Sequence, residues 1–104
     1  MAPTIVNVMY PAAASADFNM DYYLSKHMPL VQKNWGPHGL ESWTVGVLDK
    51  ETSGHHVQAV LVFKDAEGFK TAVAEDKEVM PDVANFTATK PSIWIGGVAG
   101  AWKA

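Results

Sequence analysis

The sequence predicts an α+β fold of the ferredoxin-like type, with an antiparallel four-stranded sheet that carries two helices on one face. Three observations predict it: four short segments rich in β-branched and other apolar residues, two segments with apolar residues at helical spacing, and turn-forming residues between them. In chain order these elements read βαββαβ. The length of 104 residues suits one domain, so we expect a single domain over residues 1–104.

The four expected strands end at residues that interrupt a sheet. The first begins at Thr4 and ends at Tyr10, before Pro11, which has no amide hydrogen to donate to a neighbouring strand. The second and third form a hairpin around the segment DKETSGH, whose Asp, Ser and Gly favour turns. The last three strands are therefore expected at residues 40–48, 56–64 and 92–98.

The first helix is expected to begin after Asn19, a residue type whose side chain accepts hydrogen bonds from the free amides of a first turn. Aromatic and apolar residues then recur at helical spacing through Tyr23 and His27. Pro29 interrupts this face, so we expect a kink or a restart near His27. The helix should end at Gly36.

The second helix is expected to follow Asp65 as its cap. An apolar stripe runs from Phe69 to Met80 and should end before Pro81. Asp76 shares the spacing of this stripe. It is therefore either a second acid or base that faces inward or a residue at the solvent edge of the helix.

Composition argues against nucleic acid and membrane partners. The chain has 8 Lys plus Arg and 11 Asp plus Glu, a net charge of -3, and no basic run that would bind phosphates or anionic lipid. Its longest uninterrupted apolar stretch, residues 59–63, is too short to span a bilayer. The opening MAPTIVNVMY does not resemble a secretion signal, so we expect a cytoplasmic protein.

The sequence contains no motif for a metal or a nucleotide cofactor. It has no Cys, no GxxxxGK[ST] phosphate loop, no GxGxxG after a strand and no GxSxG elbow. His55 and His56 are adjacent, with no Asp or Glu at a facial-triad spacing, so we interpret them as part of a solvated turn. We expect no cofactor and no metal, which leaves proton transfer and binding as the available chemistry.

Two of the expected strands are apolar on both faces, over residues 45–48 and 59–63. A sheet with one face in water would alternate apolar and polar residues. The two helices can cover only one face, so we expect a second copy of the chain to cover the other. The protein is therefore predicted to be a homodimer with a barrel-like core between its subunits.

The segment FNMDYYLSKHMPLV resembles the N-terminal helix of the EthD family, named for ethyl tert-butyl ether degradation, which shows a Tyr-Tyr pair, then His, then Pro-Leu. The segments FKDAEGF and PDVANFTATKPSIWI also resemble the family pattern, so the likeness covers nearly the whole chain. It implies a dimeric α+β barrel, in a superfamily shared with cofactor-free quinone-forming monooxygenases, muconolactone isomerases, haem-degrading enzymes and some fungal dehydratases. It does not specify one reaction.

His27 is the main candidate for chemistry, because an imidazole titrates near neutrality and can take or give a proton. Tyr23 precedes it by four residues, so the phenol and the imidazole share one helix face. The alternative is that His27 only satisfies backbone groups freed by Pro29. The family motif favours the functional interpretation, with His27 as general acid or base and Tyr23 beside it.

Asn7 is a third catalytic candidate, since it is polar within an apolar strand and needs a hydrogen-bond partner. The resemblance implies that it orients a carbonyl or phenol of the substrate; the alternative, which we favour, is a cross-strand or backbone hydrogen bond. The candidate ligand-binding residues supply aromatic surface or lie in the family segments, although most of the aromatic ones also suit an ordinary core: Tyr10, Tyr22, Trp43, Phe63, Phe69, Asn85, Phe86 and Trp94.

Three functional hypotheses follow. The first is a cofactor-independent enzyme, an oxidoreductase, dehydratase or isomerase, that acts on a small apolar, cyclic or aromatic compound through His27. The second is a non-catalytic accessory or carrier protein for an oxidising system. The third is a haem-binding barrel, which is disfavoured because the expected second helix contains no His.

Overall fold

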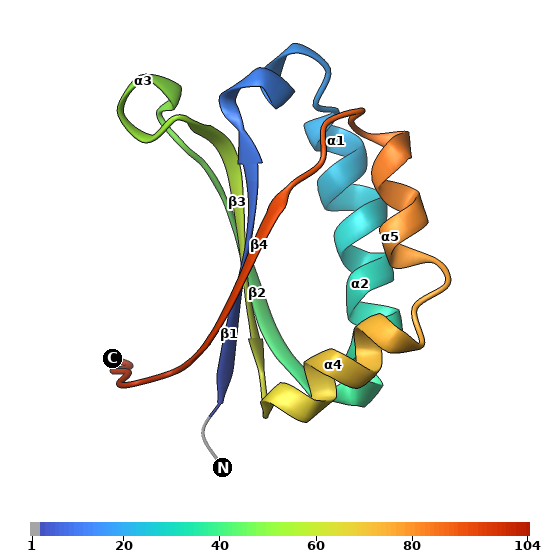
Figure 1. Ribbon diagram of the computed structural model, residues 1–104, viewed down its shortest axis with the longest axis vertical. Helices are drawn as coiled ribbons and strands as arrows, with labels where there is room; N and C mark the ends of the chain where they lie inside the picture. Colours follow the sequence, from blue (N-terminus) through green and yellow to red (C-terminus); the bar gives the residue numbers. More distant parts are fainter. Residues whose placement is uncertain (1–2) are drawn as a thin grey trace.

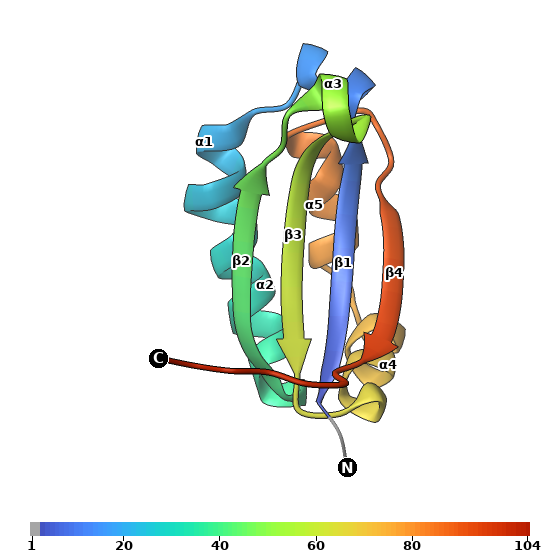
Figure 2. The same ribbon diagram turned by 90° about the vertical axis from the view of Figure 1, so that its left-hand side faces the viewer.

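The computed structural model describes residues 3–104 and contains the predicted four-stranded antiparallel sheet. The strands lie in the order β2-β3-β1-β4 (Figures 1 and 2). Their bounds are Thr4–Pro11 for β1, Leu40–Val47 for β2, His55–Phe63 for β3 and Ser92–Gly97 for β4. Each bound lies within one residue of its prediction, and the predicted fold class and element order are confirmed.

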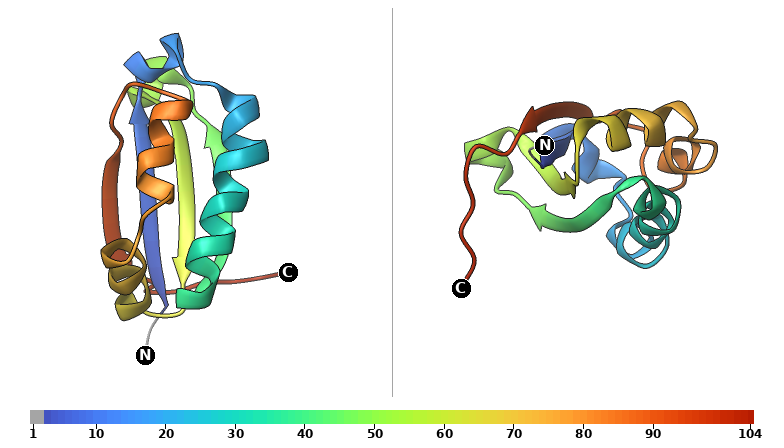
Figure 3. Two further views of the ribbon diagram at one scale, coloured as in Figure 1. Left: turned by 90° about the vertical axis from the view of Figure 1, so that its right-hand side faces the viewer. Right: turned by 90° about the horizontal axis from the view of Figure 1, so that it is seen from below.

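The main helices all lie against one face of the sheet (Figures 1 and 3), and the chain after β4 crosses one end of the other face (Figure 2). The α-helices are α1 (Met20–Tyr22), α2 (Met28–Trp35), α3 (Lys50–Ser53), α4 (Ala66–Ala74) and α5 (Val79–Asp82). Short 3₁₀ turns occupy Ala12–Ala16, Gly36–His38 and Val83–Asn85. Within residues 3–104, no helix has the length and apolar character needed to cross a membrane.

The strand register decides which side chains face the helices. Val6 of β1 lies opposite Leu61 of β3 and Ile95 of β4, and the side chains of Val6 and Leu61 are buried on the helix-covered face. Successive strand residues point to opposite faces. Asn7, with its partner Trp94 on β4, therefore points to the open face.

The first predicted helix starts after Asn19 as expected and widens near the proline. Residues Tyr23–His27 form a π-turn, closed by a hydrogen bond from the amide of Met28 to the carbonyl of Tyr23. Pro29 has no amide hydrogen, and in a regular helix its ring clashes with the carbonyl four residues earlier. The wider π-turn accommodates that ring, so the predicted kink is a one-turn change of helix type between α1 and α2.

The prediction of one second helix ending before Pro81 is wrong, because two helices occupy this segment. The first, α4, ends at Ala74, and α5 begins at Val79 and includes Pro81 in its first turn, where the missing amide hydrogen costs little. The carboxylate of Asp76 accepts hydrogen bonds from the amides of Val79 at 3.0 Å and Met80 at 2.8 Å. Asp76 thus caps α5, and its side chain does not line the cavity described below.

The hairpin between β2 and β3 contains the short helix α3, which was expected to be an irregular loop. Asp49 caps it by accepting a hydrogen bond from the amide of Glu51 at 3.1 Å, and Gly54 ends it with a φ of 73°. His55 and His56 follow at the start of β3, so the prediction that they lie in a turn is wrong.

Candidate functional site

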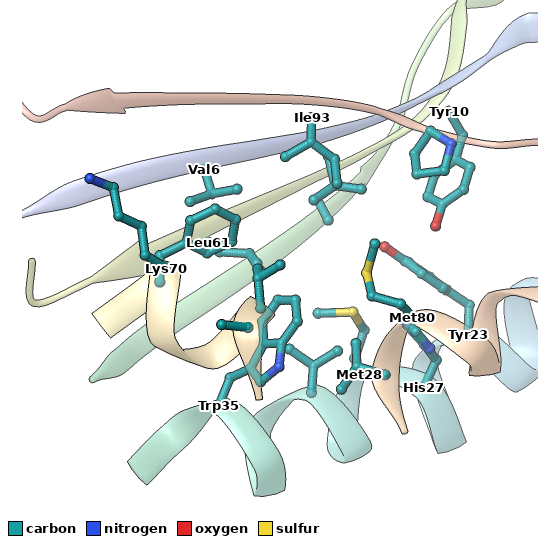
Figure 4. Close-up of a pocket in the computed structure, with 18 residues that line it drawn as sticks. Val6, Tyr10, Tyr23, His27, Met28, Trp35, Leu61, Lys70, Met80 and Ile93 are labelled. Carbon is teal, nitrogen blue, oxygen red and sulfur yellow. The ribbon is translucent and has the colours of Figure 1, made fainter. Parts of the chain in front are cut away.

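A cavity of about 460 Å³ lies between the sheet and the helices (Figure 4). Strands β1, β3 and β4 form one wall, and the π-turn with α2, α4 and α5 forms the other. Most of the lining is apolar, as at Val6, Met28 and Leu61. The lining side chains that carry a nitrogen or oxygen atom are Tyr10, Tyr23, His27, Trp35 and Lys70.

The cavity opens between the helices and β4. Val73 of α4, Met80 of α5 and Ile93 of β4 all line it, yet they are 41%, 43% and 43% exposed. Because these side chains reach both the cavity and the solvent, they form its rim. An apolar molecule entering the cavity passes an apolar rim.

The π-turn presents His27 to the cavity while its ring pairs with Asp82. His27 is only 5% exposed, and its Nδ1 lies 2.9 Å from Oδ2 of Asp82. A carboxylate can only accept a hydrogen bond, so Nδ1 carries the proton in this pair. In the neutral ring, Nε2 is then the atom with a free lone pair.

Asp82 accepts two further hydrogen bonds besides that of His27. The hydroxyl of Tyr22 donates to its Oδ1 at 2.6 Å, and the side-chain amide of Asn85 donates to the same oxygen at 2.9 Å. Burial pushes the pKa of Asp82 upward, but the hydrogen bonds from Tyr22, Asn85 and His27 together outweigh it and leave the pKa below its usual value. Asp82 is therefore ionised at neutral pH.

Burial lowers the pKa of His27, because a charged imidazole loses its hydration there. The hydrogen bond to Asp82 and the negative charges of Asp82 and Asp76 oppose this shift but do not cancel it. At pH 7 the ring is neutral, with Nδ1 donating to Asp82. This is the state in which Nε2 can accept a proton.

Tyr10 and Tyr23 bring two phenol hydroxyls to the same end of the cavity as His27, opposite Lys70 (Figure 4). Each tyrosine is 1% exposed, and their ring centroids lie 6.1 Å apart in an edge-to-face arrangement. The Tyr23 ring also stacks on His27, with centroids 5.4 Å apart and planes 13° apart. Burial raises the pKa of both phenols, so both stay neutral hydrogen-bond donors.

No family model and no curated protein matches the chain. Among solved structures, an EthD-like protein from Ralstonia eutropha JMP134 is 28% identical, with 96% of this chain and 95% of that chain covered. The two structures superpose with a TM-score of 0.82. The chain is thus similar to an EthD-like protein over nearly its whole length.

Other solved structures share the fold of this chain at lower identity. An ethyl tert-butyl ether degradation (EthD) family protein from Bacillus halodurans C-125 is 23% identical, with 94% of this chain and 99% of that chain covered and a TM-score of 0.66. A mutant of SnoaB, described as a cofactor-independent oxygenase from Streptomyces nogalater, is 14% identical, with 95% and 94% covered and a TM-score of 0.57. A dimeric ferredoxin-like protein from an uncultured marine organism is 13% identical over 96% of each chain, with a TM-score of 0.62.

Seven of the eleven predicted site residues line the cavity or contact His27 or its partner Asp82. Four of them line it: Tyr10, Tyr23, His27 and Phe69. Tyr22 and Asn85 lie behind His27, bound to Asp82. Phe86 is buried against His27, with ring centroids 4.6 Å apart.

The other four predicted residues do not line the cavity. Phe63 is fully buried in the core, and Trp43 on the edge strand β2 donates a hydrogen bond to Gln32 at 3.2 Å. Asn7 and Trp94 are on the open face of the sheet. Trp94 is 67% exposed there.

The side chain of Asn7 bonds across the sheet. Gln58 on β3 donates a hydrogen bond to Oδ1 of Asn7 at 2.7 Å. This is the cross-strand alternative of the two considered from the sequence. Asn7 lies on the face of the sheet opposite the cavity, so its side chain does not reach a substrate there.

Asp82, the partner of His27, is not among the residues predicted from the sequence. The two residues are 55 positions apart, and no spacing rule connects them. The available signal was the segment PDVANF, which resembles the family pattern and contains both Asp82 and Asn85. Within residues 3–104, no group of three His, Cys, Asp or Glu residues is placed to hold a metal ion.

Proposed function

We propose that this EthD-like protein is a cofactor-independent enzyme that moves a proton on a small apolar, cyclic or aromatic compound, with His27 as general acid or base. The observation that carries the proposal is the pairing of His27 with Asp82 at the wall of an apolar cavity. A buried imidazole with a carboxylate on one nitrogen and a cavity beside it is arranged for proton transfer.

Asp82 has two roles in this proposal. It holds the proton on Nδ1, so Nε2 is the basic atom, and it stabilises the positive charge that the ring acquires when Nε2 takes a proton. Tyr22 and Asn85 hold Asp82 in place and keep it ionised. The groups behind His27 thus orient the ring, while the groups beside it contact the substrate.

The cavity determines the class of substrate. Its volume of about 460 Å³ lies within the usual range for small-molecule sites, and its lining offers few polar partners. Burying a strongly polar molecule there would leave its polar groups without hydrogen bonds. An apolar ring system with one or two oxygen atoms suits such a site, and the reaction is an isomerisation, a dehydration, or an oxidation of an already reactive substrate in which O₂ is the oxidant.

The comparisons support a small-molecule-binding barrel of this kind. SnoaB, which has the same fold, is described as a cofactor-independent oxygenase. At 14% identity this likeness concerns the fold, and the reaction proposed here depends on the residues of the cavity.

We also propose that the protein is a homodimer whose subunits pack through the open faces of their sheets. Val60 and Val62 alternate along β3 with the buried residues that face the helices, so their half-buried side chains point to the open face. Trp94 lies on the same face and is 67% exposed. A neighbour of the same fold is described as dimeric, which agrees with this assembly.

The function is tested by following proton transfer directly. The purified protein is mixed with a panel of cyclic ketones, enones and phenols in D₂O, and NMR detects enzyme-dependent deuterium exchange or conversion. We expect at least one compound to exchange or react with the wild-type protein and not with His27→Gln, because Gln cannot accept a proton near pH 7.

Two outcomes would overturn the enzyme proposal. If compounds bind but His27→Gln exchanges them as fast as the wild type, His27 does not transfer the proton. If compounds bind and nothing reacts, the carrier hypothesis replaces the enzyme hypothesis.

A further inference from the structure

The polar end of the cavity contains two hydroxyl groups that the protein does not satisfy. Neither Tyr10 nor Tyr23 makes a side-chain hydrogen bond to any group in residues 3–104, although both are almost fully buried. Tyr22, one residue away on the helix, donates its hydroxyl to Asp82 at 2.6 Å. Buried phenol hydroxyls usually have a partner, so a molecule in the cavity is the natural acceptor for Tyr10 and Tyr23.

The two hydroxyls come from opposite walls and converge. Tyr10 is on β1 and Tyr23 on the π-turn, and both hydroxyl oxygens point into the same end of the cavity (Figure 4). Burial raises the pKa of Tyr10, and the nearby Tyr23 raises it further. A single oxygen atom of a ligand at this place would accept two hydrogen bonds.

The charge at this end favours a neutral oxygen rather than a carboxylate or phosphate. The cationic lining residue, Lys70, lies at the opposite end of the cavity (Figure 4). The imidazole of His27 is neutral at pH 7, and Asp82 behind it is negative. A permanently anionic group would lose its hydration here without a cation to compensate it.

We propose that Tyr10 and Tyr23 form a binding site for the carbonyl or phenol oxygen of an apolar ligand, and that this site selects ketones, enones, quinones and phenols. The inference rests on the proposed function, since it assigns the substrate class of the same cavity. With a β,γ-unsaturated ketone in place, His27 Nε2 takes a proton from the carbon between the carbonyl and the alkene. The electron pair of that C–H bond forms a conjugated dienolate, and the charge on its oxygen is stabilised by the two hydroxyls. The imidazolium then gives the proton to the γ-carbon, the double bond moves into conjugation with the re-formed carbonyl, and the product is the α,β-unsaturated ketone.

The test compares two probes of the same shape. In 2-acetylnaphthalene a carbonyl oxygen occupies the place that a CH₂ group has in 2-isopropenylnaphthalene, so only the first accepts hydrogen bonds. Affinities of both are measured by fluorescence titration for the wild type, Tyr10→Phe, Tyr23→Phe and the double variant. We expect each single change to weaken ketone binding about two- to tenfold, the range for one neutral hydrogen bond, and to leave alkene binding unchanged.

A second measurement covers the case in which a variant folds poorly. The carbonyl stretching frequency of the bound ketone is recorded by infrared spectroscopy in the wild-type protein, where two hydrogen bonds should lower it relative to the same ketone in an apolar solvent. Trp43→Phe, a change at an aromatic residue outside the cavity, serves as the control and should alter neither affinity nor frequency.

The results separate this inference from the proposed function. If the Tyr→Phe changes weaken both probes equally, or if the frequency is not lowered, the oxygen site is absent even if His27→Gln stops proton exchange. If the ketone preference is present but His27→Gln has no effect on exchange, the oxygen site stands and the proposed acid–base role fails.

Discussion

On the helix-covered face of the sheet, Tyr10 and Leu61 border a cavity, whereas on the open face Asn7 and Trp94 meet no helix. The same strands supply both sets of side chains, because successive residues point in opposite directions. The covered face has an interior space with ionisable groups at one end. On the open face, Gln58 donates a hydrogen bond to Asn7 at 2.7 Å, so these two polar side chains satisfy each other.

This comparison shows that a buried or half-buried polar residue indicates a functional site when its hydrogen bonds are incomplete. The neutral side-chain amide of Asn7 has a hydrogen-bond partner across the sheet. This bond is enough to account for a polar residue in the strand. His27 has a partner on one nitrogen and a cavity beside it, and the hydroxyls of Tyr10 and Tyr23 have no protein partner among the described residues. Chemistry is therefore expected on the covered face and assembly on the open face.

The largest expected effect contrasts one polar residue from each face. His27→Gln should lower turnover of a substrate found by the screen by about 10²- to 10⁴-fold, the usual loss for a general acid or base. Asn7→Ala should change it by less than about twofold, since Asn7 is on the other side of the sheet. Steady-state kinetics measures both, with thermal melting to show that the variants are folded. A loss of similar size in the two variants would contradict the division between the faces.

The next largest expected effect is on the dissociation constant of the proposed dimer. Val60→Glu places a charge in the centre of the open face, and we expect the dissociation constant of the dimer to rise by about 100-fold or more, because an unpaired buried charge is strongly destabilising. Val73→Glu puts the same change at the rim of the cavity, outside the open face, and should leave dimerisation as it is. Sedimentation equilibrium measures both. A wild-type protein that is monomeric at micromolar concentration would remove the proposed interface.

The smallest effect is the pH dependence of stability. The pKa of His27 is lower in the folded protein than in the unfolded chain, so the unfolded chain binds a proton first as the pH falls through about 6.5. The contribution of neutral His27 to the free energy of unfolding is therefore present above that pH. It is lost as the pH falls below it, by at most about 1.4 kcal/mol for each pH unit.

Urea unfolding at pH 7.5, 6.5 and 5.5 measures this dependence. We expect the free energy of unfolding to fall less steeply in His27→Gln than in the wild type. Equal slopes in the two proteins would mean that the pKa of His27 does not differ between the folded and unfolded states.

Local signals in the sequence were enough to predict most of the fold. Asn19 and Asp65 cap the helices as expected, by accepting hydrogen bonds from the amides of Tyr22 and Gly68. The break between α4 and α5 was missed, since Asp76 fits both an apolar stripe and a cap, and only the amides that it contacts distinguish them. Cap geometry is local, but the choice between two local structures depends on packing.

The site was predictable only in part. Tyr23 and His27 share a helical turn, so their spacing indicated a common face. The pairing of His27 with Asp82 joins residues 55 positions apart and needs the folded chain. Strand alternation could not say which face of β1 the helices cover, because both faces of the sheet carry apolar residues; this is why Asn7 could not be placed from the sequence.

The π-turn at Tyr23–His27 has a consequence for alignments of related chains. A π-turn corresponds to one residue inserted into an α-helix. A relative without it would align here with a one-residue gap. If the missing residue lies between the tyrosine and the histidine, the two are three positions apart instead of four, and their rings meet in a different geometry. We expect such a relative to lack the stacked pair of Tyr23 and His27, so a single gap in an alignment would mark the chains in which this site is absent.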